Sequence, residues 1–196
     1  MKRLAIAATA LALAALAGCV APVGPVQVTR FHAPDVSPLG QGAIAVEAAP
    51  GSDPASLEWQ TYSAAVTRQL ILLGYTEAKP GSGGQIALVK LSRRTLEPPG
   101  SSPVSVGVGG STGSYGSGVG LGVGINLSPK PAAEIATDLS VSIRDRASGA
   151  TLWEGRATFV VSGKSPLATT ALGAPKMSEA LFAGFPGQSG ETIEVK

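Results

Sequence analysis

The chain has 196 residues, 44% of them hydrophobic and 14% charged, and 15 basic against 13 acidic residues give a formal net charge of +2. This balance lacks the clustered basic excess of nucleic-acid-binding proteins, so nucleic acid is not an expected partner. A single cysteine, Cys19, excludes internal disulfides and thiolate metal sites, and packing alone must therefore stabilise the fold.

The first 18 residues have the layout of a secretory signal peptide. Lys2 and Arg3 precede an uncharged run from Leu4 to Gly18, which is shorter than the roughly 20 residues that a membrane-spanning helix needs. The run ends in LAGC (16–19), which resembles the lipobox of bacterial lipoproteins, where the cysteine thiol is acylated and the cysteine becomes the new N-terminus. We therefore expect residues 1–18 to be a lipoprotein signal peptide and Cys19 to be the lipidation site, carrying palmitate-type acyl chains.

The residue after Cys19 bears on the destination of the chain. Val20, and not an aspartate, stands there, and in lipoproteins this pattern implies sorting to the outer membrane. Two or more acyl chains anchor a protein stably, whereas one chain binds only reversibly. The expected location is the outer membrane of a Gram-negative envelope, facing the periplasm, with the membrane as partner through the lipid anchor.

Residues 19–40 are predicted to form the lipidated N-terminus and a proline-rich tether. Four prolines in this span prevent a helix and disfavour a central strand. They are Pro22, Pro25, Pro34 and Pro38. VQVTRF (26–31) is compatible with a short edge strand. Residues 41–196 remain as a single domain, and the chain is long enough to bury a core of its own.

The elements of this domain are predicted from hydrophobic periodicity and helix stop signals. In chain order they are a strand at 43–48, a helix at 54–73, a strand at 85–94, a hairpin of 135–144 with 151–161, and a helix around 175–183. Asp53 and Pro54 suit an N-cap and a first helical position, and Gly74 suits a helix stop. The order predicts an α+β fold, with a small, mostly antiparallel sheet, two helices on one face, and a glycine-rich β-hairpin insert.

The glycine-rich insert, residues 100–128, is the unusual feature of the sequence. Aliphatic residues alternate with glycine and serine in both of its arms, on either side of GSTGSYGSG, which predicts a hairpin with one aliphatic face. One interpretation is a flexible hairpin that packs this face on the domain. The other is an assembly or membrane element, although its first arm (103–109) is shorter than the 9–11 residues of a spanning strand and an aromatic girdle is missing.

Several segments together resemble a known family. After the lipobox come VTRFHAP, a helix ending in QLILLGY, a hairpin carrying LWEGRA, and a terminal LFAGFPGQSGETIEV. These segments, over roughly residues 26–196, look like the bacterial lipoproteins catalogued as domain of unknown function (DUF) 4136. The resemblance implies the fold and the envelope location, and it implies no catalytic residue.

Two motifs imitate catalytic or nucleotide sites. FVVSGKS (159–165) resembles the end of a phosphate-binding loop, but Thr158 stands where the loop needs a glycine, so no nucleotide is expected. GGSTG (109–113) fits the letters of a nucleophile elbow around Ser111, but the elbow needs a histidine base, and the one histidine, His32, lies in the tether. We therefore predict no catalytic, cofactor-binding or metal-binding residue, and we predict that the protein is not an enzyme.

Aromatic and basic residues are candidate binding groups. Trp59 and Trp153 fall on the apolar register of their elements, which favours a core position with a shared contact over a binding role. The local basic pairs, Arg93 with Arg94 and Arg144 with Arg146, fall near strand ends, where solvated charges are common.

Two functional hypotheses follow. The leading one is a non-enzymatic, periplasmic structural or interaction module of the envelope, whose partner is an unknown envelope protein or a second copy of the chain. The alternative is an oligomeric membrane-inserting or transport-associated component that uses the glycine-rich hairpin.

Overall fold

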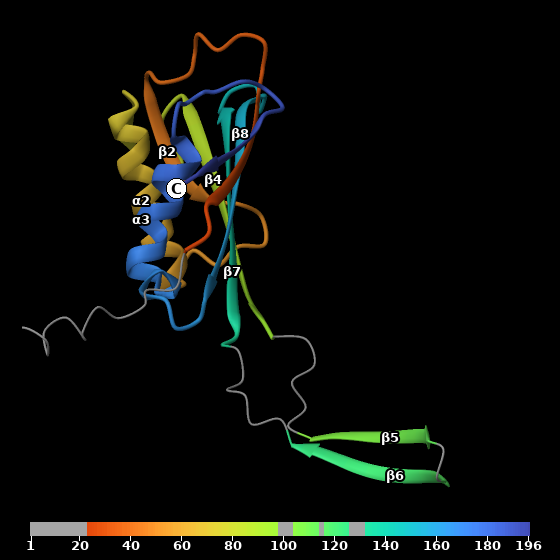
Figure 1. The fold of residues 1–196 in the computed structure, drawn as a ribbon. Coiled ribbons are helices and arrows are strands. Elements are labelled where there is room, and N and C mark those ends of the chain that lie inside the picture. Colours follow the sequence, from red (N-terminus) through yellow and green to blue (C-terminus); the bar gives the residue numbers. More distant parts are fainter. Residues whose placement is uncertain (1–22, 98–103, 114–115, 126–131) are drawn as a thin grey trace, which may run out of the picture.

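The computed structural model describes residues 23–97, 104–113, 116–125 and 132–196 (Figure 1). In chain order, the elements are β1 (Val26–His32), β2 (Ala43–Ala48), α2 (Leu57–Leu72), β3 (Thr76–Ala78), β4 (Gln85–Leu96), β5 (Val104–Gly113), β6 (Gly116–Ile125), β7 (Glu134–Asp145), β8 (Thr151–Ser162), the 3-10 turn η1 (Pro166–Ala168), α3 (Thr170–Phe182) and β9 (Thr192–Val195).

The main sheet has seven strands in the order β3-β2-β4-β7-β8-β1-β9. Strand β2 runs parallel to both β3 and β4, whereas the pairs β4–β7, β7–β8, β8–β1 and β1–β9 are antiparallel. The prediction of a small, mostly antiparallel sheet is therefore wrong, because the sheet is large and mixed. The reason lies in α2, which follows β2 and returns the chain to the starting end of β2, so that the next strands run parallel to it.

Strand β1 is an interior strand of this sheet. It pairs with β8 on one side and with β9 on the other, so residues 26–32 belong to the folded domain although they lie within the span interpreted as a tether. Pro25 and Pro34 flank the strand and are not part of it, so each residue of β1 keeps its N–H for the ladder. The short partner β9 carries too few residues for its alternation to be recognised in the sequence.

Strands β5 and β6 lie in the glycine-rich insert and form a two-stranded antiparallel sheet of their own. Their register runs from the pair Val104 and Ile125 to the pair Gly113 and Gly116. The sequence predicts that one aliphatic face of this hairpin packs on the domain. The structure describes the backbone of β5 and β6 but not the placement of their side chains, so this prediction lies outside the described part of the chain.

Helix α2 starts later than its sequence predicts. Ser56 caps it by accepting a hydrogen bond from the Trp59 amide at 3.4 Å, while Asp53 accepts one from the Ala55 amide in the preceding turn. Gly74 follows the helix at φ +105°, and a Cβ there would lie 2.5 Å from the Gly40 carbonyl oxygen. The predicted glycine stop is confirmed, and both its backbone conformation and this close approach require glycine.

Helix α3 starts five residues earlier than predicted, with Pro175 inside it. Small residues in its first turns allow it to pack closely. A Cβ on Gly173 would lie 2.9 Å from the Leu167 carbonyl oxygen and 3.3 Å from the Tyr62 hydroxyl. The Gly173 amide donates to the Thr169 carbonyl oxygen at 2.8 Å, so the helix starts before Pro175, which falls in its second turn.

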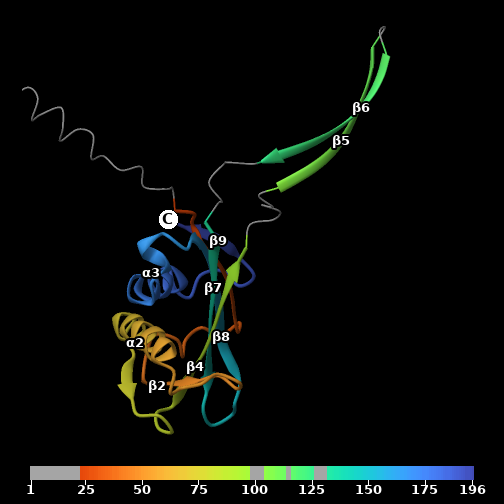
Figure 2. The ribbon, with the colours of Figure 1, turned by 90° about the horizontal axis from the view of Figure 1, so that it is seen from below.

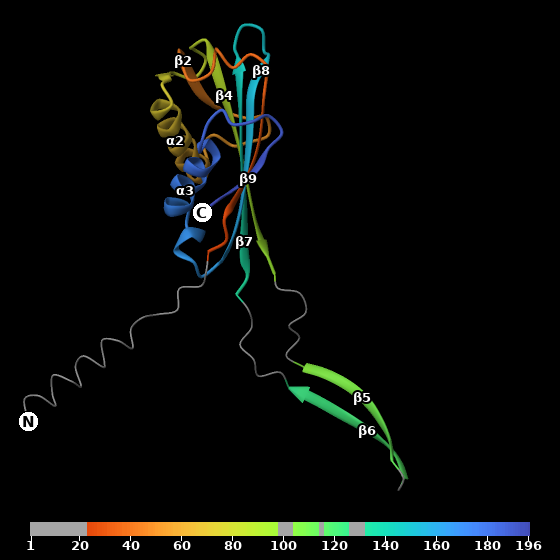
Figure 3. The same cartoon turned by 45° about the horizontal axis from the view of Figure 1, so that its top comes forward.

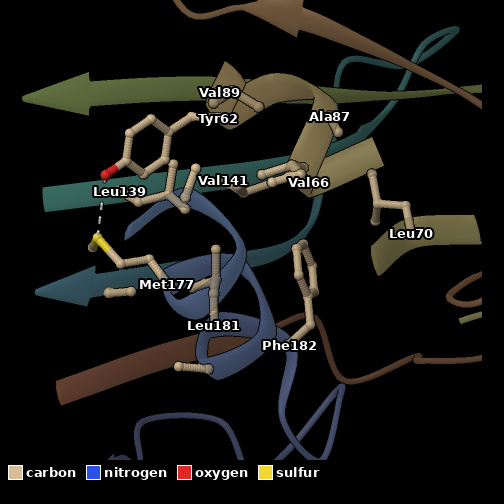
Figure 4. Close-up of a cluster of buried hydrophobic side chains, with 14 of the residues drawn as sticks. Tyr62, Val66, Leu70, Ala87, Val89, Leu139, Val141, Met177, Leu181 and Phe182 are labelled. Atoms are coloured by element: carbon tan, nitrogen blue, oxygen red, sulfur yellow. Dashed lines mark hydrogen bonds between the residues drawn. The ribbon is translucent and has the colours of Figure 1, made fainter. Parts of the chain in front are cut away.

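Both helices pack on the same face of the sheet, and the core lies between them and the strands (Figures 2 and 4). Tyr62 and Val66 of α2 meet Val141 of β7 and Met177 and Leu181 of α3, all fully buried. The Tyr62 hydroxyl lies 3.9 Å from the Met177 sulfur, which joins the two helices inside the core. This layer leaves the opposite face of β4, β7 and β8 without a covering helix in the described part of the chain.

One end of the sheet carries several chain exits (Figure 3). At this end, Glu134 of β7 pairs with Leu96 of β4 on one side and with Ser162 of β8 on the other. The chain before β1 reaches the same end, since a Cβ on Gly24 would lie 4.0 Å from the Val160 carbonyl oxygen. Gly24, just before β1, and the paired ends of β4 and β7 therefore lie at the same end of the sheet.

Candidate functional site

A groove of about 540 Å³ lies between α2 and the strands β2 and β3. Trp59, Ser63, Ala64 and Thr67 of α2 form one wall. The opposite wall consists of Val46, Glu47 and Ala48 of β2 with Glu77 and Ala78 of β3, and Pro54 and Pro80 also line the groove. The Trp59 indole nitrogen donates to the Val89 carbonyl oxygen at 3.2 Å, so the sheet fixes the ring at the side of the groove.

The carboxylate of Glu47 is already occupied by its neighbours. Its Oε1 accepts from the Gly81 amide at 2.9 Å and from Arg146 Nη2 at 2.7 Å. The Gly81 hydrogen bond, and after it the Arg146 hydrogen bond, lower the pKa of Glu47 below its usual value. Glu47 is therefore ionised at neutral pH, where it ties the turn before β4 to the end of β7 and has no proton to give to a substrate.

A second hollow, of about 430 Å³, lies on the open face of the sheet; we call it the open-face basin. Every side chain that lines it is polar: Lys90, Ser92, Arg94, Asp138, Ser140, Arg156 and Thr158. The register places Lys90, Ser140 and Arg156 side by side across β4, β7 and β8. It likewise places Ser92, Asp138 and Thr158 in the adjacent row.

The one carboxylate of the open-face basin is neutralised within the sheet. Asp138 Oδ2 lies 3.1 Å from Arg94 Nη1, and its Oδ1 accepts from the Thr158 hydroxyl at 2.8 Å. Arg156 donates to the Ser140 hydroxyl at 3.4 Å and lies 4.0 Å from the Glu154 carboxylate, with about half or more of both charged side chains exposed. The lining holds three cations and one carboxylate, so its charge is positive.

The residues singled out in the sequence are scattered. Cys19 lies outside the described residues, and so does the side chain of Ser111. His32 ends β1, where its Nδ1 lies 2.7 Å from the Ala33 carbonyl oxygen. In the SGKS segment, the Gly163 amide donates to the Ala133 carbonyl oxygen and the Ser165 hydroxyl caps η1, so the segment serves as a turn.

The two tryptophans have different surroundings. Trp153 is fully buried and stacks on Phe182 with ring centroids 5.3 Å apart, and Phe185 lies 5.2 Å away. Trp59 is half-buried beside the groove. The core assignment is right for Trp153, but its aromatic neighbours are phenylalanines of α3 and the segment after it, in place of the expected contact with Trp59.

Two of the four arginines that we interpreted as solvated strand-end charges are instead bound inside the domain. Arg93 donates to the Glu58 carboxylate, to the Thr170 hydroxyl at 3.2 Å and to the Ala168 carbonyl oxygen at 2.5 Å, which ties β4 to the starts of both helices. Arg146 forms the ion pair with Glu47. Arg93 was misjudged because strand alternation turns it toward the helices and its neighbour Arg94 toward solvent.

No family model and no curated protein matches the sequence. Among solved structures, the chain is similar to a PDZ domain protein from Parabacteroides distasonis ATCC 8503, at 10% identity over 88% of this chain and 39% of that chain, with a TM-score of 0.47. It is also similar to the PelC dodecamer from Paraburkholderia phytofirmans, at 13% identity over 80% of this chain and 97% of that chain, with a TM-score of 0.40. The chain thus spans about two fifths of the PDZ domain protein. Likenesses at this level assign no function.

Neither hollow is predicted from the sequence. The polar positions of the basin alternate with core positions in each strand, so that signal is present in the sequence. The sequence does not show how the three strands pair, and it is this pairing that sets Lys90, Ser140 and Arg156 in one row. The groove depends on β3, a strand of three residues that no alternation reveals.

Proposed function

We propose that the chain is a lipid-anchored outer-membrane protein facing the periplasm, and that it acts as a non-enzymatic structural or interaction module of the envelope, akin to the DUF 4136 lipoproteins. The observation that carries this proposal is the short stretch of sequence between Cys19 and the first strand of the domain. Seven residue steps separate Cys19 from Val26, the first residue of β1. Such a stretch reaches at most about 25 Å, so an acylated Cys19 would hold the domain close to the bilayer.

The surroundings of the polar groups support a role other than catalysis. Glu47 in the groove and Asp138 in the basin are each held by an arginine and a second donor. Groups bound in this way stabilise the sheet and are not poised for proton transfer. No helix in the described ranges is long and apolar enough to cross a membrane. The acyl chains are the membrane attachment that we propose.

The anchor is tested by replacing the proposed acylation site. We expect Cys19→Ser to abolish labelling by radioactive palmitate and to leave unprocessed precursor or mislocalised protein, because serine lacks the thiol that takes the lipid. Val20→Ala is the control and should be labelled like the wild type. Val20→Asp should keep the label but move from the outer to the inner membrane fraction. Normal labelling of Cys19→Ser would refute the proposal.

The alternative, an oligomeric membrane-inserting component, predicts a different effect of the glycine-rich insert. Leu96 and Glu134 are paired at the end of β4 and β7, so a shorter connection can join these strands. We expect replacement of residues 103–127 by a short Gly-Ser turn to leave a cooperatively unfolding domain, since loop length contributes little to closure entropy.

Light scattering of the detergent-extracted protein separates the two hypotheses. We expect the wild type and the shortened variant to have the same number of copies per particle. A large wild-type assembly that is lost in the variant would favour the membrane-inserting alternative. A variant that does not fold would contradict both and would make the insert part of the folded core.

A further inference from the structure

The open-face basin has cations that the protein itself does not neutralise. Arg94 is matched by Asp138, but Lys90 has no carboxylate partner in the described part of the chain, and Arg156 has only the 4.0 Å contact with Glu154. Lys90 and Arg156 flank Ser140 in one row across three strands. Their backbones are therefore about 10 Å apart, twice the spacing between neighbouring strands. Two separated cations suit a ligand with anionic groups on successive units.

Hydroxyl groups lie between these cations, together with the Asp138 carboxylate that Arg94 neutralises. Ser92, Ser140 and Thr158 lie in adjacent rows of the basin, and each hydroxyl both donates and accepts hydrogen bonds. The lining has no aromatic or aliphatic side chain. It therefore lacks the stacking surface that single-stranded nucleic acids use and the apolar pocket that anchors a peptide. Hydroxyl groups flanked by cations match the hydroxyls and acidic groups of a sugar chain.

The shape of the basin also separates a sugar chain from a membrane surface. Ser140 and Thr158 are half-buried, whereas Ser92 and the cationic residues Lys90, Arg94 and Arg156 are exposed. A flat layer of lipid headgroups would meet the long cationic side chains but would not reach the half-buried hydroxyls of Ser140 and Thr158. A narrow polymer can lie in the hollow and use both.

We propose that the open-face basin binds an acidic glycan, whose carboxylates pair with Lys90 and Arg156 and whose hydroxyls bond to Ser92, Ser140 and Thr158. This inference goes beyond the envelope role and does not depend on acylation of Cys19, because the basin is formed by the sheet alone.

The test is isothermal titration calorimetry on the full chain in a nonionic detergent. The probes are oligogalacturonate, a carboxylate glycan; a malto-oligosaccharide of equal length, which is neutral; and glycerophosphoglycerol, a soluble lipid headgroup. The variant Lys90→Gln with Arg156→Gln removes the two available cations. Its matched control, Lys79→Gln with Lys176→Gln, removes the same charge from residues outside the basin lining.

We expect the wild type to bind oligogalacturonate more tightly than either other probe, and to lose affinity as salt is raised. The Lys90 and Arg156 double variant should bind at least about tenfold more weakly, because two charged hydrogen-bonding groups are lost. Ser140→Asp, which places a carboxylate between the two cations, should weaken binding in the same direction. The control pair should bind like the wild type.

Four results would overturn the proposal. They are failure of the wild type to bind oligogalacturonate, equal binding of the neutral sugar, unchanged affinity in a double variant that unfolds like the wild type, and tighter binding of glycerophosphoglycerol. The last result would assign the basin to lipid headgroups.

Discussion

We expect Val141→Asp to abolish most of the folding stability of the domain. Val141 is fully buried, and its strand partners are Val89 on β4 and Gly155 on β8. None of these side chains can pair with a carboxylate, so the substitution places an uncompensated charge in the core. A loss of about 4 kcal/mol or more is expected, against the 5–15 kcal/mol that small domains have in total.

The matched control is the neighbouring Ser140→Asp. Alternation along β7 turns Ser140 to the open face, between Lys90 and Arg156, where a new carboxylate has two cations nearby. Its free energy of unfolding should change by about 1 kcal/mol or less. Urea denaturation followed by circular dichroism measures both variants. Equal losses would show that the assignment of the two faces of β7 is wrong.

The second large effect is expected for Trp153→Ala. The Trp153 ring packs against Phe182 and Phe185, and its indole nitrogen donates to the Pro186 carbonyl oxygen at 3.0 Å. Gly155 leaves room for this ring, since a Cβ at that position would lie 2.2 Å from Trp153 Cη2. Truncation removes the ring and leaves a cavity that the glycine cannot fill. The expected loss is about 3–5 kcal/mol.

Trp59→Ala is the comparison for this variant. Trp59 is half-buried beside the groove, so its removal exposes the groove wall and leaves no closed cavity. We expect a smaller loss, about 1–2 kcal/mol, in the same denaturation experiment. A loss for Trp59→Ala as large as that for Trp153→Ala would contradict the assignment of Trp153 as the central aromatic residue of the core.

Local periodicity was sufficient for the elements that carry a long pattern. The strands at 85–94, 135–144 and 151–161 and the helix up to Gly74 are confirmed as β4, the β7–β8 hairpin and α2. Alternation over ten or more residues marks the buried face of a strand whatever its neighbours are. The starts of both helices were misplaced because proline and capping residues also occur in the turns that precede a helix.

The sequence alone determined the expectation for Cys19, since a lipobox is a contiguous stretch, and it also determined which side of each long strand is apolar. Only the tertiary structure decided that β1 lies inside the sheet, that β2 runs parallel to its neighbours, and that Arg93 joins both helices to β4. The tertiary structure also decided that the open-face basin forms, because Lys90, Ser140 and Arg156 come from three strands and only strand pairing sets them in one row. The physical reason is that strand pairing joins residues that lie far apart in the sequence, such as Val26 and Val195, and the register that aligns them is set by the packing of the whole sheet against its helices.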